Sequence, residues 1–477
     1  MAFYSVVLAG GGGTRLWPVS TRHAPKPFRS FLGPDRPTLF RMTIDRALRS
    51  AVPKALRVVC APHLSPLVGF ELEQLGFASS SVVIEEPEPR NTGPAVLLAA
   101  LHLVSQDPQA VMAVLPADHL IRREADYDRA IALAARAAED RRVVLLGLVP
   151  DRPETGFGYI ESEPGAAPFQ PVPVRRFVEK PDAQKARAFV ESGHYFWNSG
   201  IFVFRADVVI EEFARFQPDM VRAMKAFLAG DTSAFARCVD LSFDYAVLEH
   251  SERVTVIPVD LGWSDVGNWW AVHEQFPLDE SGNSARGSVV SRDSRNCHLH
   301  AETRPLVVLG MENAVVVESQ AGVLVAGSQW MQEVREAVDD LPVATPSSEP
   351  DDAPVIEGEH CRPWGRFRIL DQGPGFKTKR LDVLPGRRTS LQKHDYRAEN
   401  WIVTSGLARV TRGDEVFELK TGETTHIPVG CIHRIENPGQ EMLSLVEVQA
   451  GERLLESDVH RIADDYGRAP AECATSS

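Results

Sequence analysis

The residues near the amino terminus with the clearest chemistry form a glycine-rich loop. In LAGGGGTRLWPVSTRHAPKPF, residues 8–28, four glycines follow an apolar run, and two cations, Arg15 and Lys26, lie downstream. Glycine lets a backbone approach a phosphate and direct N–H groups at it, and nearby cations neutralise its charge. No Gly-Lys-Ser/Thr follows, and Arg15 stands where a dinucleotide fingerprint requires glycine. Against the alternative of a simple flexible turn, we expect a polyphosphate site that comprises Gly10, Gly11, Gly12, Gly13, Thr14, Arg15 and Lys26.

Two aspartates are candidate ligands for a hard cation. Asp118 follows the apolar run VMAVLP, at the C-terminal end of a predicted strand, and Asp265 lies in a glycine-rich turn. Carboxylates from distant segments can share a Mg²⁺ ion, which takes oxygen ligands and bridges phosphates. A role in capping a helix or closing a turn is the alternative for each aspartate.

Two further groups of residues can contact a substrate. Arg90, Asn91 and Thr92 precede an apolar helix and can hold a base or a phosphate at its N-terminus, or simply cap it. Glu179 and Lys180 are adjacent opposite charges. They can hold sugar hydroxyls and a phosphate, or form an ordinary surface ion pair of little energy.

A second candidate centre lies in GRRTSLQKHDYRAEN, residues 386–400. The spacing of His394 and Glu399 suggests a metal site. Gln392 and His394 are two residues apart, so in a strand both side chains point to the same face.

Alternating elements must position the N-terminal groups. Short apolar runs such as SVVLA, LRVVC and RVVLLGL alternate with amphipathic segments such as YDRAIALAARAAED. This rhythm predicts an α/β fold with a mostly parallel sheet. Such sheets bind ligands beyond the carboxyl ends of their strands.

Changes of pattern divide the chain. We expect the α/β domain to span residues 1–275. Residues 285–335 hold short β-rich runs that predict a small, solenoid-like segment, and residues 336–358 have the proline-rich, acidic composition of a linker. Residues 359–477 begin with regularly spaced short strands, which predict an antiparallel sandwich or barrel.

Composition excludes several classes of protein. A chain of 477 residues is too long for one ordinary core, and a net charge of −14 argues against a nucleic-acid or anionic-membrane surface. No apolar run approaches the length needed to span a bilayer, and the start lacks the basic region of a signal peptide. Six scattered cysteines without a CxxC pair favour a reducing, cytoplasmic setting.

The glycine-rich stretch resembles the signature of sugar-1-phosphate nucleotidyltransferases, in the form typical of mannose-1-phosphate guanylyltransferases. Further blocks agree in order: EEPEPRNTGPA, LPADHLI, PETGFGYIE, FVEKPD, WNSGIFVF, FDYAVLEHS and GWSDVGNW. The resemblance implies a Rossmann-like domain in which Asp118 and Asp265 hold Mg²⁺. It also implies that the sugar phosphate is bound by Gly158, Glu179, Lys180 and Asn198.

The reaction that this resemblance implies is a direct displacement. An oxygen of mannose 1-phosphate attacks the α-phosphorus of GTP, and pyrophosphate leaves. Arg15 and Lys26 would neutralise the developing charge beside the metal. A thymidylyl- or adenylyltransferase acting on glucose 1-phosphate is the alternative.

The C-terminal segment resembles cupin barrels. With Gly386 as the first glycine of the cupin motif, Gln392, His394 and Glu399 fall at ligand positions, and a second motif from Gly422 adds His433. We expect Glu399 and His433 on neighbouring strands. The set suits Zn²⁺ or another divalent metal.

In greater detail, this segment resembles the type II phosphomannose isomerase domain. The resemblance implies interconversion of fructose 6-phosphate and mannose 6-phosphate, with Arg397 holding phosphate or an enediolate. The chain has Tyr396 and Asn400 where the family often has histidine. A barrel that acts only in binding or dimerisation is therefore the alternative. The expected partners are GTP, mannose 1-phosphate and hexose 6-phosphates, with a homodimer as a candidate assembly.

Overall fold

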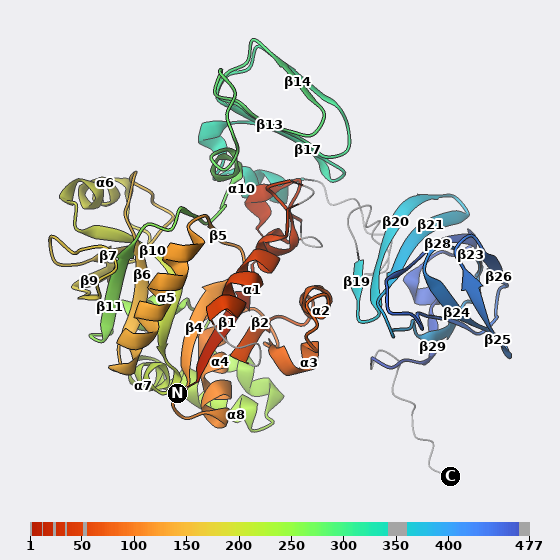
Figure 1. The fold of residues 1–477 in the computed structure, drawn as a ribbon, viewed down its shortest axis with the longest axis horizontal. Coiled ribbons are helices and arrows are strands. Elements are labelled where there is room, and N and C mark those ends of the chain that lie inside the picture. Colours follow the sequence, from red (N-terminus) through yellow and green to blue (C-terminus); the bar gives the residue numbers. More distant parts are fainter. Residues whose placement is uncertain are drawn as a thin grey trace.

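The computed structural model of the protein describes residues 2–11, 13–21, 25–33, 36–50, 55–341 and 360–466. Figure 1 shows three parts: an α/β domain, a small β segment above it and a β-barrel to its right. Helix α10 (Val334–Asp339) occupies the start of the predicted linker. The rest of that linker, from residue 342 onward, lies outside the described residues.

A ten-stranded sheet forms the centre of the α/β domain, in the order β3-β2-β1-β4-β10-β6-β11-β8, with β7 and β9 at one side. The pairs of β1 with β2 and β4, β2 with β3, and β6 with β11 are parallel. However, β10 runs antiparallel to β4 and β6, and β8 antiparallel to β11. The strands are β1 (Phe3–Ala9), β2 (Leu56–Cys60), β3 (Val83–Glu85), β4 (Val111–Pro116), β6 (Val143–Leu148), β7 (Tyr159–Glu161), β8 (Val172–Pro173), β9 (Arg176–Val178), β10 (Tyr195–Arg205) and β11 (Val254–Val259).

The predicted α/β fold is therefore confirmed, but the sheet is mixed rather than mostly parallel. An apolar run specifies a strand buried on both faces without specifying the direction in which it pairs.

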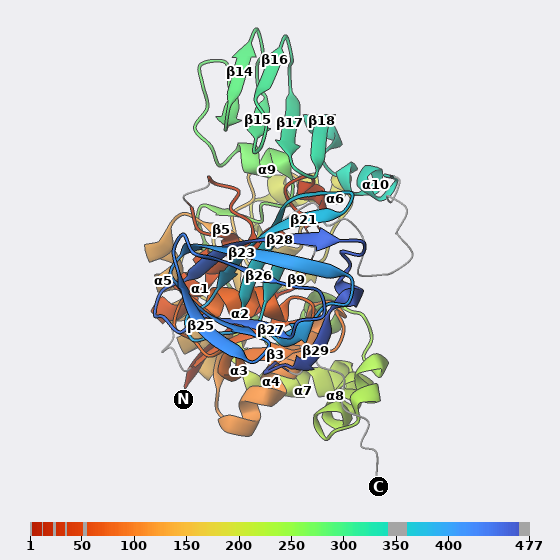
Figure 2. The ribbon, with the colours of Figure 1, turned by 90° about the vertical axis from the view of Figure 1, so that its right-hand side faces the viewer.

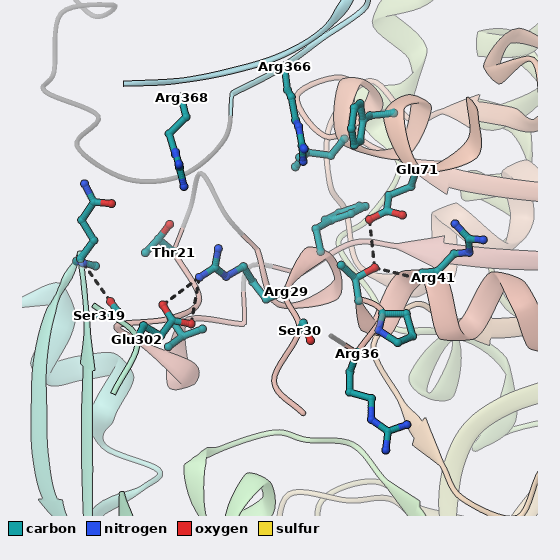
Figure 3. Close-up of a pocket in the computed structure, with 18 of the residues that line it drawn as sticks. Thr21, Arg29, Ser30, Arg36, Arg41, Glu71, Glu302, Ser319, Arg366 and Arg368 are labelled. Atoms are coloured by element: carbon teal, nitrogen blue, oxygen red, sulfur yellow. Dashed lines mark hydrogen bonds and ion pairs between the residues drawn. The ribbon is translucent and has the colours of Figure 1, made fainter. Parts of the chain in front are cut away.

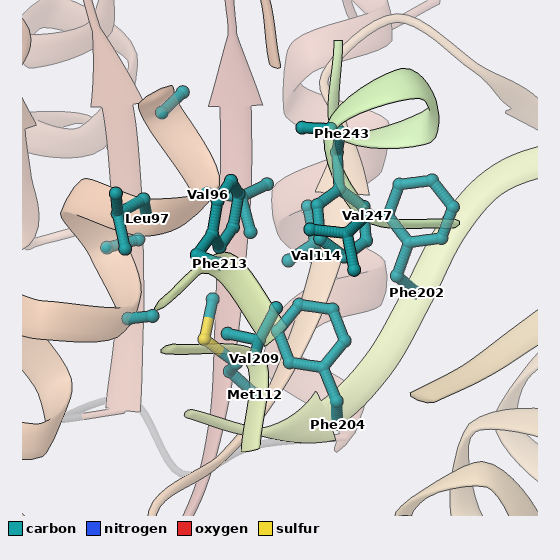
Figure 4. Close-up of a cluster of buried hydrophobic side chains, with 14 of the residues drawn as sticks. Val96, Leu97, Met112, Val114, Phe202, Phe204, Val209, Phe213, Phe243 and Val247 are labelled. Carbon is teal, nitrogen blue, oxygen red and sulfur yellow. The ribbon is translucent and has the colours of Figure 1, made fainter. Parts of the chain in front are cut away.

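Helices cover both faces of this sheet. On one face pack α4 (Thr92–Gln106), α7 (Ala206–Phe216), α8 (Pro218–Leu228) and the π-helical turn Asp244–Leu248. The other face carries α1 (Leu39–Ser50), α2 (Ser65–Glu73), α5 (Glu124–Glu139) and α6 (Ala183–Ser192), and short α3 (Ser79–Val82) lies near α2. In the first layer, Phe213 of α7 and Phe243 pack against Phe202 and Phe204 of β10 (Figure 4). Among the described helices, none has the length and apolar character needed to cross a membrane.

A two-stranded ribbon outside the main sheet joins distant parts of the chain. Strand β5 (Leu120–Ile121) pairs with β12 (Trp263–Ser264). Asp118 lies two residues before β5, and Asp265 immediately follows β12. The ribbon therefore brings the two candidate metal ligands to the same end of the sheet.

The small β segment is a β-helix of parallel turns. Strands β13 (Ser284–Arg286), β15 (His298–Ala301) and β17 (Ala314–Ser319) stack in parallel, as do β14 (Val289–Arg292) and β16 (Leu306–Leu309). Strand β18 (Gly322–Gly327) closes the stack antiparallel to β17. The predicted solenoid-like segment is thereby confirmed.

This β-helix and helix α9 (Trp269–His273) form hydrogen bonds with the backbone of the segment that follows the glycine loop. The indole Nε1 of Trp269 donates to the carbonyl of Trp17 at 2.8 Å, and Ser319 Oγ donates to the carbonyl of Pro18 at 2.9 Å. Arg286 donates to the carbonyl of Ser30 at 2.9 Å. Hydrogen bonds to backbone carbonyls thus fix this segment at Trp17, Pro18 and Ser30.

The C-terminal domain is an antiparallel barrel of two sheets, as predicted (Figures 1 and 2). Its two sheets have the orders β19-β20-β21-β28-β23-β26 and β25-β24-β27-β22-β29. Arg387 of the barrel pairs with Glu73 of α2 at 2.6 Å, so the barrel contacts the α/β domain. The strands are β19 (His360–Arg362), β20 (Gly365–Gly373), β21 (Phe376–Val383), β22 (Leu391–Lys393), β23 (Arg397–Ser405), β24 (Leu407–Arg412), β25 (Glu415–Lys420), β26 (Thr424–Ile427), β27 (His433–Glu436), β28 (Leu443–Gly451) and β29 (His460–Ala463).

Candidate active sites

A cavity of about 870 Å³ opens at the carboxyl ends of β1 and β4. This is the edge at which α/β sheets bind ligands. Its wall includes Gly10 and Gly11 after β1, and Asp118 after β4. The same wall also includes Asp265 and the sugar-side residues Gly158, Glu179 and Asn198. The structure thus brings most of the predicted N-terminal residues to one cavity.

Lys26 connects the two aspartate segments beside this cavity. Its Nζ lies 2.6 Å from Asp118 Oδ2 and also donates to the backbone carbonyl of Asp265. The lysine side chain is only 7% exposed. Gly13, at φ 59°, allows this approach, because a Cβ there would lie 2.3 Å from Lys26 Cβ.

The electrostatics of the two aspartates differ. Burial would raise the pKa of Asp118, but the Lys26 ammonium, His119 and hydrogen bonds together outweigh it, so that this pKa falls below its usual value. Burial raises the pKa of Asp265, and Lys26 offsets this only in part. Two partly buried carboxylates with one nearby ammonium leave negative charge uncompensated, and a divalent cation with oxygen ligands fits such a donor set.

The predicted sugar-side residues converge around Asn198. Its backbone N–H donates to the carbonyl of Gly158 at 2.8 Å, and its side-chain amide donates to Asp244 Oδ1 at 2.8 Å. A Cβ at Gly158 would lie 2.5 Å from Glu179 Oε2, so glycine is needed for this approach. Lys180 instead pairs with Glu179 at 2.9 Å and is 59% exposed, outside the cavity wall.

The nucleotide-side prediction is met only in part. Asn91 and Thr92 line the cavity, and Asn91 caps α4 by accepting the N–H of Thr92 at 3.0 Å. Arg90 is absent from the wall and donates to Glu88 and to the carbonyl of Cys238. Arg15 is exposed and likewise outside the described wall. Gly12 is not among the described residues.

Sequence reasoning missed several residues of this wall. Burial and the neighbouring Glu179 raise the pKa of Asp244 to about 7. Asp244 lies in the FDYAVLEHS block, which supports the family resemblance but does not by itself indicate a function for this aspartate. Burial also raises the pKa of Glu86 to about 7. Arg335 reaches the cavity from α10, beyond the β-helix, and no local pattern indicated it.

A second centre lies inside the barrel, where His394, Glu399 and His433 are all buried. One candidate ligand atom from each lies within 4.8 Å of the others. His394 Nε2 is 3.0 Å from Glu399 Oε1, and His433 Nε2 is 3.5 Å from Glu399 Oε2. The structure therefore brings together three of the four predicted ligands as a compact N/O group.

The outer nitrogen of each histidine contacts a backbone carbonyl. Nδ1 of His394 lies 2.9 Å from the carbonyl of Asp458, and Nδ1 of His433 lies 2.9 Å from that of Cys431. Donation from Nδ1 leaves a lone pair on each Nε2, which is the usual arrangement of a metal-binding histidine. His433 Nε2 is buried and accepts no hydrogen bond from the described residues. These features fit a divalent cation.

The fourth predicted ligand and the predicted arginine also lie here. Gln392 on β22 is the register partner of His433 on β27, and its Oε1 accepts a hydrogen bond from Ser390 at 2.8 Å. Arg397 is buried, and its guanidinium contacts Glu399 at 3.3 Å and the carbonyl of Leu455 at 2.8 Å. Arg397 thus holds the glutamate rather than projecting freely into solvent.

One expectation about strand order is wrong. Glu399 on β23 and His433 on β27 belong to the two different sheets of the barrel, and they meet across its interior. The spacing of the two motifs specifies which side chains point inward, whereas closure of the barrel determines which strands face each other.

The two departures from the isomerase pattern lie outside this centre. Tyr396 is 47% exposed. Asn400 lies on the exposed side of β23, where its Oδ1 lies 2.9 Å from His426 Nδ1. Neither residue lines the interior cavity. The substitutions therefore leave the His394, Glu399 and His433 group intact.

The interior cavity contains further residues that the sequence motifs did not indicate. Trp401 Nε1 donates to Glu399 and to Glu447, each at 3.1 Å, and Gln449 donates to the same two carboxylates. Lys379 and Arg461 also line the cavity. The Nε of Arg461 is buried without a hydrogen-bond partner among the described residues, so it is free to bind an anion.

Comparison with known protein families agrees with these two centres. The Nucleotidyl transferase model matches residues 4–282, the MannoseP isomerase/GMP-like beta-helix domain matches 287–341, and the Mannose-6-phosphate isomerase C-terminal model matches 351–464. Alginate biosynthesis protein AlgA of Pseudomonas aeruginosa is 40% identical, with 97% of each chain covered. Mannose-1-phosphate guanylyltransferase of Escherichia coli is 37% identical, over 97% of this chain and 99% of its own. This chain belongs to the bifunctional mannose-1-phosphate guanylyltransferase/mannose-6-phosphate isomerase family.

A solved structure extends the agreement to three dimensions. The crystal structure of mannose-1-phosphate geranyltransferase from Thermus thermophilus has a TM-score of 0.63 and 34% identity. It covers 71% of this chain and 99% of its own. We call the α/β domain the transferase domain and the barrel the isomerase domain from here on. The predicted limits 1–275, 285–335, 336–358 and 359–477 stay predictions, close to the matched ranges.

The barrel centre leads to a prediction about metal content. Replacing the buried His433 by alanine removes an inward nitrogen, so we expect bound divalent metal to be lost, with affinity reduced by more than about 100-fold. The matched control is His426→Ala, which removes an exposed histidine outside the cavity and leaves metal content at the wild-type level. Mass spectrometry of metals per chain after dialysis measures this. Equal metal in both variants would contradict the assigned centre.

Proposed function

We propose that the transferase domain moves GMP from GTP to mannose 1-phosphate, giving GDP-mannose and pyrophosphate. The observation that carries this proposal is the contact of Lys26 with both aspartate segments at the mouth of the glycine loop. Relatives that share the whole length of the chain bear the corresponding names, which supports the choice of base and sugar.

The side chains of the cavity suit a direct displacement. The glycine loop would bind the triphosphate through its backbone N–H groups, and the Lys26 ammonium would stabilise the charge that develops on the leaving pyrophosphate. Glu179 and Asn198 would orient the sugar so that a phosphate oxygen of mannose 1-phosphate attacks in line. Asp118 and Asp265 would hold Mg²⁺, which supplies charge neutralisation for the phosphates when bound. The roles of Arg15, Arg90 and Lys180 stay predictions.

Product analysis tests this proposal. The whole chain incubated with mannose 1-phosphate and Mg²⁺ is expected to release pyrophosphate fastest with GTP, compared with ATP and dTTP. The sugar nucleotide formed is identified by chromatography. Faster turnover of ATP or dTTP would overturn the guanine assignment, and the same assay with glucose 1-phosphate tests the sugar.

We propose further that the isomerase domain interconverts fructose 6-phosphate and mannose 6-phosphate. The observation that carries this is the inward-facing group of His394, Glu399 and His433. Its Glu399 also lines a cavity in the barrel, together with Lys379, Glu447 and Arg461. The residues favour Zn²⁺ or a similar divalent cation, which would polarise the sugar oxygens at C1 and C2.

The other residues of the cavity have roles in this proposal that follow from their places. The Glu447 carboxylate lies on the cavity wall, and Glu447 is the register partner of Lys379 on the adjacent strand. It would carry the proton between C1 and C2. Arg461, with its unpartnered buried nitrogen, would bind the sugar phosphate. Burial raises the pKa of the Glu399 carboxyl, but His394 and His433, and to a smaller extent the Arg397 guanidinium, lower it below its usual value. Arg397 would also keep this carboxylate oriented.

Substitution of Arg461 tests the second proposal against a non-catalytic barrel. In Arg461→Gln we expect KM for fructose 6-phosphate to rise by about tenfold or more, with a smaller change in kcat, because one charge-assisted contact to phosphate is lost. Arg409→Gln, which alters an exposed arginine paired with Glu418 and Glu436, is the matched control. Absence of isomerase turnover in the metal-loaded wild type would favour a binding or dimerisation module.

A further inference from the structure

A second large cavity lies where the three parts of the molecule meet (Figure 3). It holds about 740 Å³, a size typical of small-molecule sites. The transferase domain contributes described residues of the stretches 18–21, 28–30 and 36–45, and residues of α2 such as Phe70 and Glu71. The β-helix contributes Glu302 and Ser319, and strand β20 of the isomerase domain contributes Arg366 and Arg368. We call this cavity the junction cleft.

The wall of the junction cleft is rich in cations. Five arginines line it against three carboxylates, in a chain whose net charge is −14. Figure 3 shows Arg366 and Arg368 extending from β20 on the side of the cleft opposite Arg29. The five arginines are Arg29, Arg36, Arg41, Arg366 and Arg368.

Two of these five arginines have no carboxylate partner among the described residues. Arg29 pairs with Glu302 at 3.3 Å, Arg41 with Asp45 at 3.1 Å, and Arg366 with Asp382 at 3.1 Å. Among the residues that the structure describes, Arg36 and Arg368 form no ion pair. In Figure 3, Arg368 points from β20 toward Arg29, whereas Arg36 extends on the side away from Arg368. An unpaired guanidinium group in a concave wall attracts an anion, and phosphate matches its planar, bidentate donors.

The neutral part of the wall favours a sugar. Thr21, Ser30, Gln74 and Thr303 contribute hydroxyl and amide groups of the kind that bond sugar hydroxyls. The hydroxyls of Ser30 and Thr303 donate to Gly33 and Glu318, so they can act toward a sugar only as acceptors. Phe28 and Phe70 add apolar rings, which pack against the C–H faces of sugars.

We propose that the junction cleft binds a phosphorylated hexose and that its occupation is coupled to guanylyl transfer. The ligand class rests on the proposed function, since both domains would act on hexose phosphates. The cleft is separate from both active cavities, because none of its described lining residues also lines the transferase cavity or the isomerase cavity.

The coupling follows from one continuous segment. Thr21, Phe28 and Arg29 line the cleft, while Lys26 of the same segment reaches Asp118 and Asp265 in the transferase cavity. The N–H of Arg29 donates to the carbonyl of Lys26 at 3.2 Å, within a short 3-10 turn (Lys26–Phe28). A ligand that bridges Arg29 and Arg368 would therefore restrain the backbone that places the Lys26 ammonium.

Equilibrium dialysis of the metal-loaded full chain with labelled mannose 6-phosphate tests binding. We expect the variant R36Q/R368Q to bind one equivalent fewer than wild type, or to bind that equivalent at least about tenfold more weakly, because the charge-assisted contact of Arg368 is lost. R36K/R368K, which keeps both charges, should retain the equivalent. Both arginines are exposed and unpaired in the described structure, so the variants keep the fold; R409Q is the matched control.

This result is separable from the isomerase proposal. Arg461→Gln alters the barrel cavity alone. If the isomerase proposal fails, this variant binds as much mannose 6-phosphate as the wild type does, while R36Q/R368Q still loses its equivalent. Binding by R36Q/R368Q that equals wild type would overturn the junction cleft. Inorganic phosphate and GDP-mannose serve as competitors; displacement from the cleft by phosphate as effectively as by mannose 6-phosphate would overturn the sugar component.

Coupling is measured in the transferase assay. Mannose 6-phosphate is expected to lower KM for GTP by about fivefold in wild type, and to leave KM unchanged in R36Q/R368Q. Basal transferase activity should be the same in both, since neither arginine lines the transferase cavity. An equal response of the two proteins, or no response in wild type, would overturn the coupling.

Discussion

The position of one buried ammonium group determines the architecture of the transferase cavity. Lys26 Nζ contacts the carboxylate of Asp118 and the backbone of Asp265, two residues that are far apart in the sequence. Three features make this possible: a glycine at position 13, the β5–β12 ribbon that aligns the aspartates, and the hydrogen bonds from α9 and the β-helix that fix the carbonyls of Trp17, Pro18 and Ser30. A buried charge is stable only with partners, so each of these features supports the others.

The β-helix therefore supports the wall of the transferase cavity. It holds the segment between the glycine loop and α1, and the chain beyond it returns through α10 to add Arg335 to the cavity wall. The isomerase domain applies the same principle differently. Backbone carbonyls of Asp458 and Cys431 fix the outer nitrogens of two histidines, so that their inner nitrogens face one carboxylate.

Much of this arrangement could be predicted from the sequence, because local patterns specify local chemistry. Period-two spacing places Gln392 and His394 in the barrel interior, and the glycine loop indicates a phosphate site after the first strand. Contacts that depend on closure of the whole fold could not be predicted. The antiparallel direction of β10, the meeting of Glu399 and His433 across two sheets, and the arrival of Arg335 from α10 are examples. The contact of Arg90 with Glu88 also depends on surroundings that no motif encodes, whereas the ion pair of Lys180 with Glu179 was one of the two alternatives for these adjacent charges.

If Lys26 and the two aspartates form the phosphate-transfer centre, removing one carboxylate charge must slow guanylyl transfer. The decisive measurement is the rate of GDP-mannose formation by Asp118→Asn, compared with that of the wild type. The asparagine keeps the shape and can still accept a hydrogen bond from Lys26, so the thermal midpoint provides a check of folding. Asp128→Asn, at an exposed aspartate of α5 paired with Arg49, is the control. We expect Asp118→Asn to lower kcat at saturating Mg²⁺ by at least about 100-fold, and Asp128→Asn to keep the wild-type kcat. A folded Asp118→Asn enzyme with the wild-type rate would contradict it.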